Sequence, residues 1–84
     1  MNSYDFMVQM VWNKAVIVQG YDQAIWRKDR YGNWIKRSDH GNRNSKYGWE
    51  IDHITPIALF GSDHISNLQP LHFKANLAKQ DYIL

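Results

Sequence analysis

Two short stretches of the chain concentrate residue types that hydrolytic chemistry uses. Asp52 and His53 adjoin within residues 48–56, Asn67 follows His53 by fourteen positions, and Asn76 and Lys79 come nine and twelve positions after Asn67. The unperturbed pKa of an imidazole lies close to neutral pH, which makes histidine a natural general base. Carboxylate and amide oxygens are the ligands that hard cations such as magnesium or manganese prefer. The pattern therefore predicts a metal-dependent nuclease site.

Each of these side chains can be given a part in cleaving a phosphodiester, which needs an activated water, a cation on the phosphate oxygens and a stabilised leaving oxygen. His53 would deprotonate the water. Asp52 and Asn76 would supply oxygen ligands in a sparse shell that water and phosphate complete. Lys79 lies one turn beyond Asn76 on a helical face, where its ammonium can approach the phosphate as a point charge.

The elements that must position these residues can be predicted from local patterns. Residues 49–54 alternate as a strand, with Glu50 and Asp52 on one side and His53 on the other, and Pro56 ends it. A connection over 55–66 follows, with Gly61 as its hinge and apolar side chains expected to pack inward: Ile57, Leu59 and Phe60. Residues 67–71 form a second short strand and residues 72–80 a helix, with His72 and Asn76 one turn apart.

The sequence of the N-terminal half predicts further elements, which would brace the strands and helix of residues 49–80. A helix is expected over residues 4–19, with a break near Asn13 as the alternative, followed by a turn at 20–22. Residues 24–28 and 34–37 read as a hairpin around Gly32 and Asn33, which tolerate the backbone angles of a tight reversal. Residues 38–46 are polar and form a surface loop. The tryptophans are expected in the core: Trp12, Trp26, Trp34 and Trp49.

Positive charge gathers in the middle of the chain. Residues 26–46 hold seven basic residues against two acidic ones, although the formal net charge of the whole sequence is only +2. Such a stretch fits either a surface that contacts phosphates or a solvated hairpin face. The candidate nucleic-acid contacts are Arg27, Arg30, Arg37, Arg43, Lys46 and, further on, Lys74.

The same residues carry a resemblance to a known family. Asp52-His53-Ile54-x-Pro56, Gly61-Ser62-Asp63, the run from Asn67 to His72, and Asn76-x-x-Lys79 resemble the signature of the HNH endonucleases, the ββα-metal finger superfamily. The likeness covers roughly residues 49–81, and the joint spacing of its parts is far more specific than any one motif.

This resemblance implies a role for each matched residue. His53 would be the general base, and Asp52 and Asn76 would hold a single divalent cation, with magnesium expected first and manganese, nickel or zinc as alternatives. Asn67 would tie the loop between the strands and orient the base. Lys79 would face the scissile phosphate. The products implied are a 5′-phosphate and a 3′-hydroxyl.

His72 and the absence of cysteine mark departures from the family pattern. Many members carry two Cys-x-x-Cys pairs that bind a structural zinc, and this chain has no cysteine. His72 lies four positions before Asn76 and is a candidate metal ligand, yet relatives with a second helical ligand place it after the asparagine, where this chain has Gln80. A packing or phosphate-contacting role is the favoured alternative for His72. The loop also has Gly61-Ser62 where a Gly-Gly pair is common.

The predicted fold is α+β: a ββα-metal finger of strand, long loop, strand and helix, braced by an N-terminal helix and a β-hairpin. We expect one domain over residues 1–84, with the helical brace at 1–23, the hairpin and basic loop at 24–47, and the finger at 48–81. No apolar window is long enough to span a membrane and no secretion signal is recognisable, which predicts a cytoplasmic protein that does not enter membranes.

Three functions are compatible with these residues. The first is a metal-dependent endonuclease that nicks or cuts duplex DNA. The second is a non-catalytic DNA-binding module that keeps the finger as a scaffold, although a pure binder needs no base and ligands together. The third is a nuclease subunit that is active only within a larger assembly. Since one site cuts one strand, a homodimer would provide the two sites that a double-strand cut needs.

Overall fold

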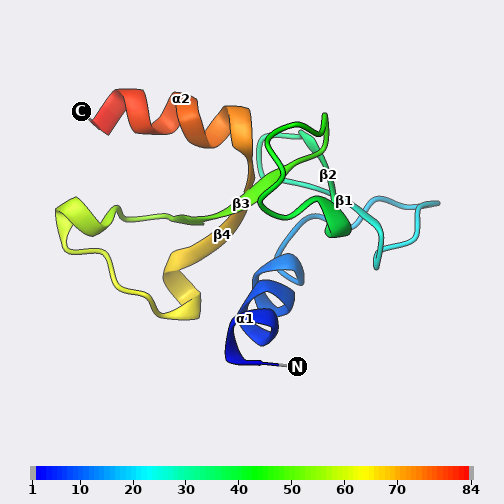
Figure 1. Cartoon of the computed structure of the whole chain (residues 1–84), viewed down its shortest axis with the longest axis horizontal. Coiled ribbons are helices and arrows are strands. Elements are labelled where there is room, and N and C mark those ends of the chain that lie inside the picture. The colour runs from blue at the N-terminus through cyan, green and yellow to red at the C-terminus, as the bar shows by residue number, and fades with distance from the viewer. Residues whose placement is uncertain (1, 84) are drawn as a thin grey trace.

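The computed structural model describes residues 2–83, with side chains described for residues 2–80. Two antiparallel hairpins form the centre, and a helix lies at each end of the chain (Figure 1). The elements, in chain order, are α1 Ser3–Trp12, β1 Trp26–Lys28, β2 Trp34–Lys36, β3 Trp49–His53, β4 Leu68–His72 and α2 Phe73–Ile83. Short 3-10 turns cover Arg37–Asp39, Ile57–Leu59 and Ile65–Asn67. This is the predicted α+β arrangement, with the ββα unit formed by β3, β4 and α2.

Helix α1 begins at a cap and ends earlier than predicted. The side chain of Asn2 accepts a hydrogen bond from the backbone N–H of Asp5 at 2.8 Å, which satisfies one of the first-turn donors. The helix ends at Trp12. The alternative of a break near Asn13 is therefore confirmed. The helix does not continue to residue 19, because Val16 instead exchanges two backbone hydrogen bonds with Lys28 of β1, at 2.8 and 3.0 Å. β-branched residues follow Ala15 in this segment and favour the extended backbone.

The core forms where α1 meets both hairpins. Trp12 and Trp49 are fully buried, and their ring centroids lie 5.3 Å apart at a tilt of 42°. Each indole N–H finds a carbonyl, that of Gln23 at 3.0 Å for Trp12 and that of Lys36 at 2.9 Å for Trp49. The remaining buried apolar residues of this cluster are Val8, Val11, Ala15, Ile35 and Leu68. Two of the four tryptophans are thus central, whereas Trp26 and Trp34 are only half-buried, which corrects their placement in the core.

The hairpin β1–β2 is tied to the ββα unit by a buried aspartate. Asp29 is 1% exposed, and its carboxylate accepts hydrogen bonds from the backbone N–H groups of Tyr31 and Asn33 in the turn. The same carboxylate accepts from the N–H of His72 at 3.1 Å, at the junction of β4 and α2. Gly32, with φ of 83°, supplies the left-handed residue that this turn needs.

The loop between β3 and β4 differs from the prediction in the direction of its apolar side chains. Ile57, Leu59 and Phe60 are 65%, 62% and 99% exposed, so the expectation that they pack inward was wrong. The short 3-10 turn at Ile57–Leu59 ends in Phe60, whose backbone is left-handed with φ of 65°. This conformation turns the ring out to solvent. Gly61 is needed for close approach, because a Cβ there would lie 1.7 Å from the carbonyl oxygen of Thr55.

Within the described residues, no helix combines the length and apolar character needed to cross a membrane.

Candidate active site

Strand β3 presents its acidic residues to α2. β3 pairs with β4 in a register that places Glu50 opposite Leu71 and Asp52 opposite Gln69. Because side chains alternate along a strand, Glu50 and Asp52 share one face, and both reach residues of α2. Trp49 on the other face joins the core. The predicted alternation of this strand is therefore confirmed, and it directs two carboxylates toward the helix that carries Asn76 and Lys79.

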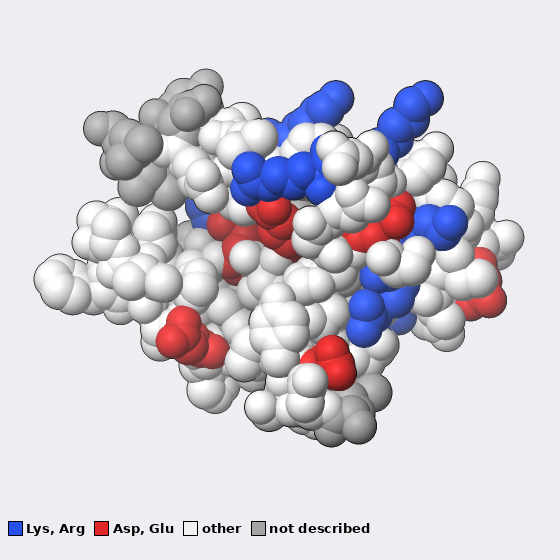
Figure 2. Space-filling model, viewed as in Figure 1, with Lys and Arg blue, Asp and Glu red and all other residues white. Residues whose placement is uncertain are grey.

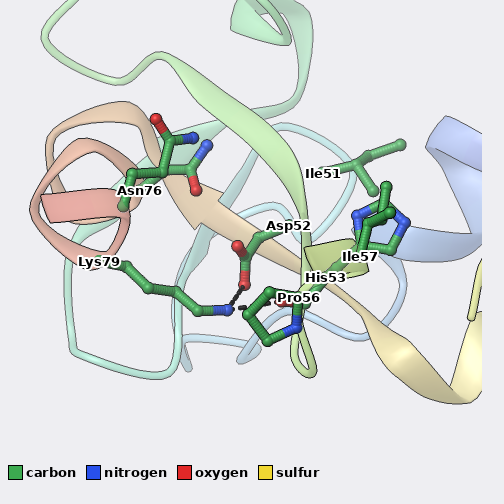
Figure 3. Close-up of a pocket in the computed structure, with 8 residues that line it drawn as sticks. Ile51, Asp52, His53, Pro56, Ile57, Asn76 and Lys79 are labelled. Atoms are coloured by element: carbon green, nitrogen blue, oxygen red, sulfur yellow. Dashed lines mark hydrogen bonds and ion pairs between the residues drawn. The ribbon is translucent and has the colours of Figure 1, made fainter. Parts of the chain in front are cut away.

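Asp52 is a buried carboxylate with two cross-element partners. Its Oδ2 accepts from Lys79 Nζ at 2.7 Å and from Gln69 Nε2 at 2.8 Å. The ammonium of Lys79 also donates to the carbonyl oxygen of His53 at 2.6 Å and to that of Ile54 at 3.3 Å. A buried carboxylate needs such compensation, because desolvation disfavours an unpaired charge. Figure 3 shows Lys79 reaching from α2 to Asp52 across the pocket.

Asn76 is held in one orientation by a chain of polar contacts. Its Nδ2 donates to Glu50 Oε1 at 2.8 Å, and Glu50 also accepts a fork of two hydrogen bonds from Arg43, at 2.7 and 2.9 Å. The hydrogen bond from Arg43 holds the pKa of Glu50 below its usual value, against the opposing effect of burial, and Asn76 acts in the same direction. Only the amide nitrogen can donate to a carboxylate, so the amide oxygen of Asn76 is the atom that this contact leaves as a potential ligand.

His53 lies on the opposite side of β3 from the Asp52 carboxylate, as Figure 3 shows. Its Nε2 lies 2.7 Å from Oδ1 of Asp63, a residue of the loop between β3 and β4. The Asp63 side chain is 86% exposed and that of His53 is 26% exposed. If Nε2 carries the proton that the carboxylate accepts, Nδ1 is the ring nitrogen available to take a proton from water.

Asn67 ties the two ends of this loop together. Its Oδ1 accepts from the N–H of Thr55 at 2.8 Å, and its Nδ2 donates to the carbonyls of Thr55 at 3.0 Å and Ser62 at 2.7 Å. The three hydrogen bonds hold the backbone at Thr55, two residues after His53, and at Ser62, the residue before Asp63. The geometry matches the loop-tying role that the resemblance implied for Asn67.

His72 is buried and both of its ring nitrogens have partners. Nε2 lies 2.7 Å from the carbonyl oxygen of Lys46, and Nδ1 accepts from the N–H of Lys74 at 3.1 Å. The ring also stacks on Phe73, with centroids 4.8 Å apart. A histidine held in this way has no nitrogen left for a cation, so we do not keep His72 among the metal ligands. Its contacts fit the packing role that the sequence had left open.

One shallow pocket of about 190 Å³ brings the predicted residues together. It lies between the end of β3, the loop that follows it and α2. Its lining is Ile51, Asp52, His53, Pro56, Ile57, Asn76, Lys79 and Gln80. In the space-filling view, basic side chains border a central group of acidic ones (Figure 2).

The donor set of this pocket suits a hard divalent cation held by few protein ligands. Asp52 on β3 offers a carboxylate and Asn76 on α2 offers an amide oxygen, and both side chains lie where these two elements face each other. Among the described residues, no group of three histidine, cysteine, aspartate or glutamate side chains is placed to bind a metal by itself. A cation here would therefore rely on water and phosphate oxygens for the rest of its shell.

The predicted DNA contacts differ in how much of each side chain is available. Arg27 is 6% exposed, and its guanidinium donates to the carbonyls of Gln23, Asn13 and Ala15 at 3.0 to 3.2 Å. It braces the segment after α1, and we leave it out of any DNA surface. Arg37 donates to Gln9 at 3.0 Å and Arg43 is paired with Glu50. Exposed basic side chains remain at Arg30, Lys46 and Lys74.

Sequence reasoning gave no role to three residues that contact the side chains of this pocket. Glu50 orients Asn76, Asp63 binds the ring of His53, and Gln69 donates to Asp52. The alternation of β3 placed Glu50 beside Asp52, and that signal could have found it. Asp63 lies in an irregular loop, so no periodicity indicated where its carboxylate would point.

Comparison with known families gives one result. The model of the family described as HNH endonuclease matches residues 36–81, more than half of the 84-residue chain. Neither curated proteins nor solved structures include a significant match to this chain.

Proposed function

Because this chain belongs to the HNH endonuclease family, we propose that it hydrolyses phosphodiester bonds of DNA with the help of one divalent cation. The observation that carries this proposal is the pocket in which Asp52, Asn76 and Lys79 converge from β3 and α2, with His53 on its wall. A general base, two hard oxygen ligands and a cationic side chain in one pocket are the parts that the reaction needs.

His53 would act as the general base. Its Nδ1 takes a proton from water while the water oxygen forms a bond to phosphorus, and the bond from phosphorus to the 3′ oxygen breaks with its electron pair leaving on that oxygen, which takes a proton from a second water molecule. Asp63, 2.7 Å from Nε2, would hold the ring in the required tautomer and stabilise the imidazolium that forms. The products would be a 5′-phosphate and a 3′-hydroxyl.

Asp52 and Asn76 would hold the cation, with magnesium as the first expectation and manganese, nickel or zinc as alternatives. Bound there, the cation would neutralise charge on the phosphate and on the leaving oxygen. Glu50 and Arg43 would keep the Asn76 oxygen turned toward it. Lys79, which balances the charge of Asp52 in this structure, is long enough to turn its ammonium to a phosphate oxygen instead.

DNA would lie across the pocket mouth, with exposed basic side chains on its backbone. Arg30, Lys46 and Lys74 are the candidates that the structure leaves exposed, and Arg37 and Arg43 would contribute only if they exchange their present partners. Since one site cuts one strand, a homodimer or a larger assembly would be needed for paired cuts.

A labelled duplex tests the proposal against a binding module. With magnesium, the wild-type chain should release fragments that carry 5′-phosphates, and the His53→Ala chain should shift the duplex in a gel without cutting it. A nuclease that fails to cut because it needs a partner subunit would still bind the duplex and the cation. If neither the wild-type nor the His53→Ala chain cuts, and both bind the duplex but not the cation, the result would favour the scaffold that only binds.

A further inference from the structure

The outer face of the hairpin β1–β2 alternates tryptophan and lysine across its two strands. The register pairs Trp26 with Lys36 and Lys28 with Trp34. All four residues are half-buried, whereas the residues between them, Arg27 and Ile35, are buried on the inner face. The hairpin therefore supports the core with one face and presents an aromatic and basic surface with the other.

Two tyrosines turn this surface into a pocket. Tyr21, Trp26, Trp34 and Tyr47 line a concavity of about 270 Å³. The rings of Trp26 and Tyr47 meet edge to face at 4.9 Å, and those of Tyr21 and Trp34 lie 4.7 Å apart at 57°. Tyr21 is 53% exposed and Tyr47 is 37% exposed. The volume lies near the lower end of small-molecule sites, about 300 Å³, which suits a ligand of one or two rings.

The charge around the pocket limits the kind of ligand it would accept. Lys28 Nζ lies 4.8 Å from the Trp34 ring and Lys36 Nζ 5.5 Å from the Trp26 ring. Aromatic walls alone would also suit a quaternary ammonium group, but two lysines at the rings repel a cation. Aromatic faces beside positive charges instead favour a flat ring attached to an anionic backbone.

We propose that this aromatic pocket binds an unstacked nucleobase of single-stranded DNA, with Lys28 and Lys36 on the neighbouring phosphates. The inference rests on the proposed function for the class of ligand, but it concerns different elements from the pocket at β3 and α2. A base inside an intact duplex is already stacked on its neighbours and is not available to such a pocket. The preferred substrates would then carry a single-stranded segment beside the position that is cut.

Tryptophan fluorescence isolates this pocket from the rest of the chain. Trp12 and Trp49 are fully buried, so quenching by an added oligonucleotide would come from Trp26 and Trp34. The probe is an oligothymidylate of roughly ten nucleotides, within the site sizes of single-strand-binding folds, titrated into the His53→Ala chain without divalent metal. The matched control is an abasic oligonucleotide of the same length, which keeps the phosphates and lacks the bases.

The proposal predicts quenching by the oligothymidylate and binding about tenfold weaker for the abasic strand. Tyr21→Ala, at an exposed position, should weaken oligothymidylate binding about tenfold, and Trp34→Leu should do the same while Trp34→Phe retains most of it. Phe6→Ala removes an aromatic side chain that is 59% exposed on α1 and should change nothing. Circular dichroism of each variant would verify that it is folded.

Two outcomes would overturn the proposal. One is equal affinity for the abasic and the thymidylate strands, with no effect of Tyr21→Ala; binding would then depend on phosphates alone. The other is quenching by a trimethyl-lysine peptide and none by the oligonucleotide, which would make the pocket a cation cage. The assay involves no cleavage, so a chain that cuts duplex DNA and fails here loses only this inference, and a chain that binds here and cuts nothing loses only the proposed function.

Discussion

The ammonium of Lys79 lies 2.7 Å from the carboxylate of Asp52, and it also donates to the backbone carbonyls of His53 and Ile54. One side chain of α2 thereby fixes the end of β3 where the proposed ligand and the proposed base adjoin.

Lys79→Met should lower the free energy of unfolding by about 1–2 kcal/mol in EDTA, because it leaves the buried Asp52 carboxylate without its cationic partner. Urea denaturation measures the loss. Adding manganese should restore part of the stability of the variant, since a bound cation supplies the missing charge. An Asp52→Asn, Lys79→Met double variant that loses as much as the sum of the single changes would show that the two groups are not coupled.

Glu50→Gln should weaken manganese binding about tenfold, the lower end of the effect expected for partners that orient metal ligands. A glutamine amide can present either its oxygen or its nitrogen, so Asn76 would no longer be held with its oxygen outward. Isothermal titration measures the affinity. Lys46→Gln, which removes an exposed charge with no recorded contact to Asn76, is the matched control. Unchanged affinity in Glu50→Gln would mean that Asn76 needs no support.

Asp63→Asn should reduce the rate of DNA cleavage about tenfold without changing manganese affinity, because its partner is the proposed base and not a ligand. Single-turnover cleavage of a labelled duplex separates this effect from binding. Asp39→Asn, at the end of the 3-10 turn Arg37–Asp39, serves as a control for loss of one acidic charge. A change in metal affinity that accounts for the whole rate effect would contradict the assignment of Asp63 to His53.

Stability should fall below neutral pH because of His40. Burial, and then the charge of Arg37, lower the pKa of His40 from 6.5, while Glu50 opposes them. The folded chain therefore disfavours the protonated ring more than the unfolded chain does. The stabilising contribution is full above pH 6.5 and is lost as the pH falls from there through the lower pKa of the folded state.

Urea denaturation at pH 7.5 and pH 5.5 checks this pH dependence. His40→Gln should show a smaller difference between the two pH values than the wild-type chain. His64→Gln is the matched control, because His64 lies in an exposed loop. Identical differences in the wild-type and His40→Gln chains would show that another group carries the pH dependence.

Phe60→Gly should stabilise the chain by about 1 kcal/mol. Phe60 has a left-handed backbone that costs a non-glycine residue about 1–2 kcal/mol. Glycine removes this cost, but part of the stabilisation is lost because glycine gives the unfolded chain more conformational freedom. The ring is 99% exposed, so little packing is lost. Thermal unfolding followed by circular dichroism measures the change. Destabilisation would mean that the Phe60 ring makes a contact the monomer does not reveal.

The ββα unit could be predicted because its signals are local. The alternation of residues 49–54 and the asparagine and lysine spacing on α2 are short-range patterns, and they place Asp52, Asn76 and Lys79 in one pocket. The contacts that orient these side chains could not be predicted. Arg43 reaches Glu50 from a polar loop, and Asp63 reaches His53 across the β3–β4 connection, where no repeat guides the backbone.

The N-terminal half shows where local patterns mislead. The apolar residues after Trp12 continue a helical spacing, yet β1 offers Val16 a backbone partner in Lys28, and this tertiary pairing decides the conformation. Basic residues are a second example. Arg27 looks like the other arginines in sequence, but its neighbours bury it against three carbonyls. Ile57, Leu59 and Phe60 are apolar and still exposed, because the close approach of Gly61 to Thr55 fixes the path of the loop.

Conversion of supercoiled plasmid to nicked or linear form, with magnesium, manganese, nickel, zinc or EDTA, tests the central claim most directly. The wild-type chain should cut with at least one of the ions and not with EDTA, and His53→Ala and Asn76→Ala should each lose cutting while remaining folded. The ratio of linear to nicked product would report whether two copies act together. Wild-type protein that is folded and binds DNA, but cuts with none of the ions, would contradict the claim that this chain is by itself a nuclease.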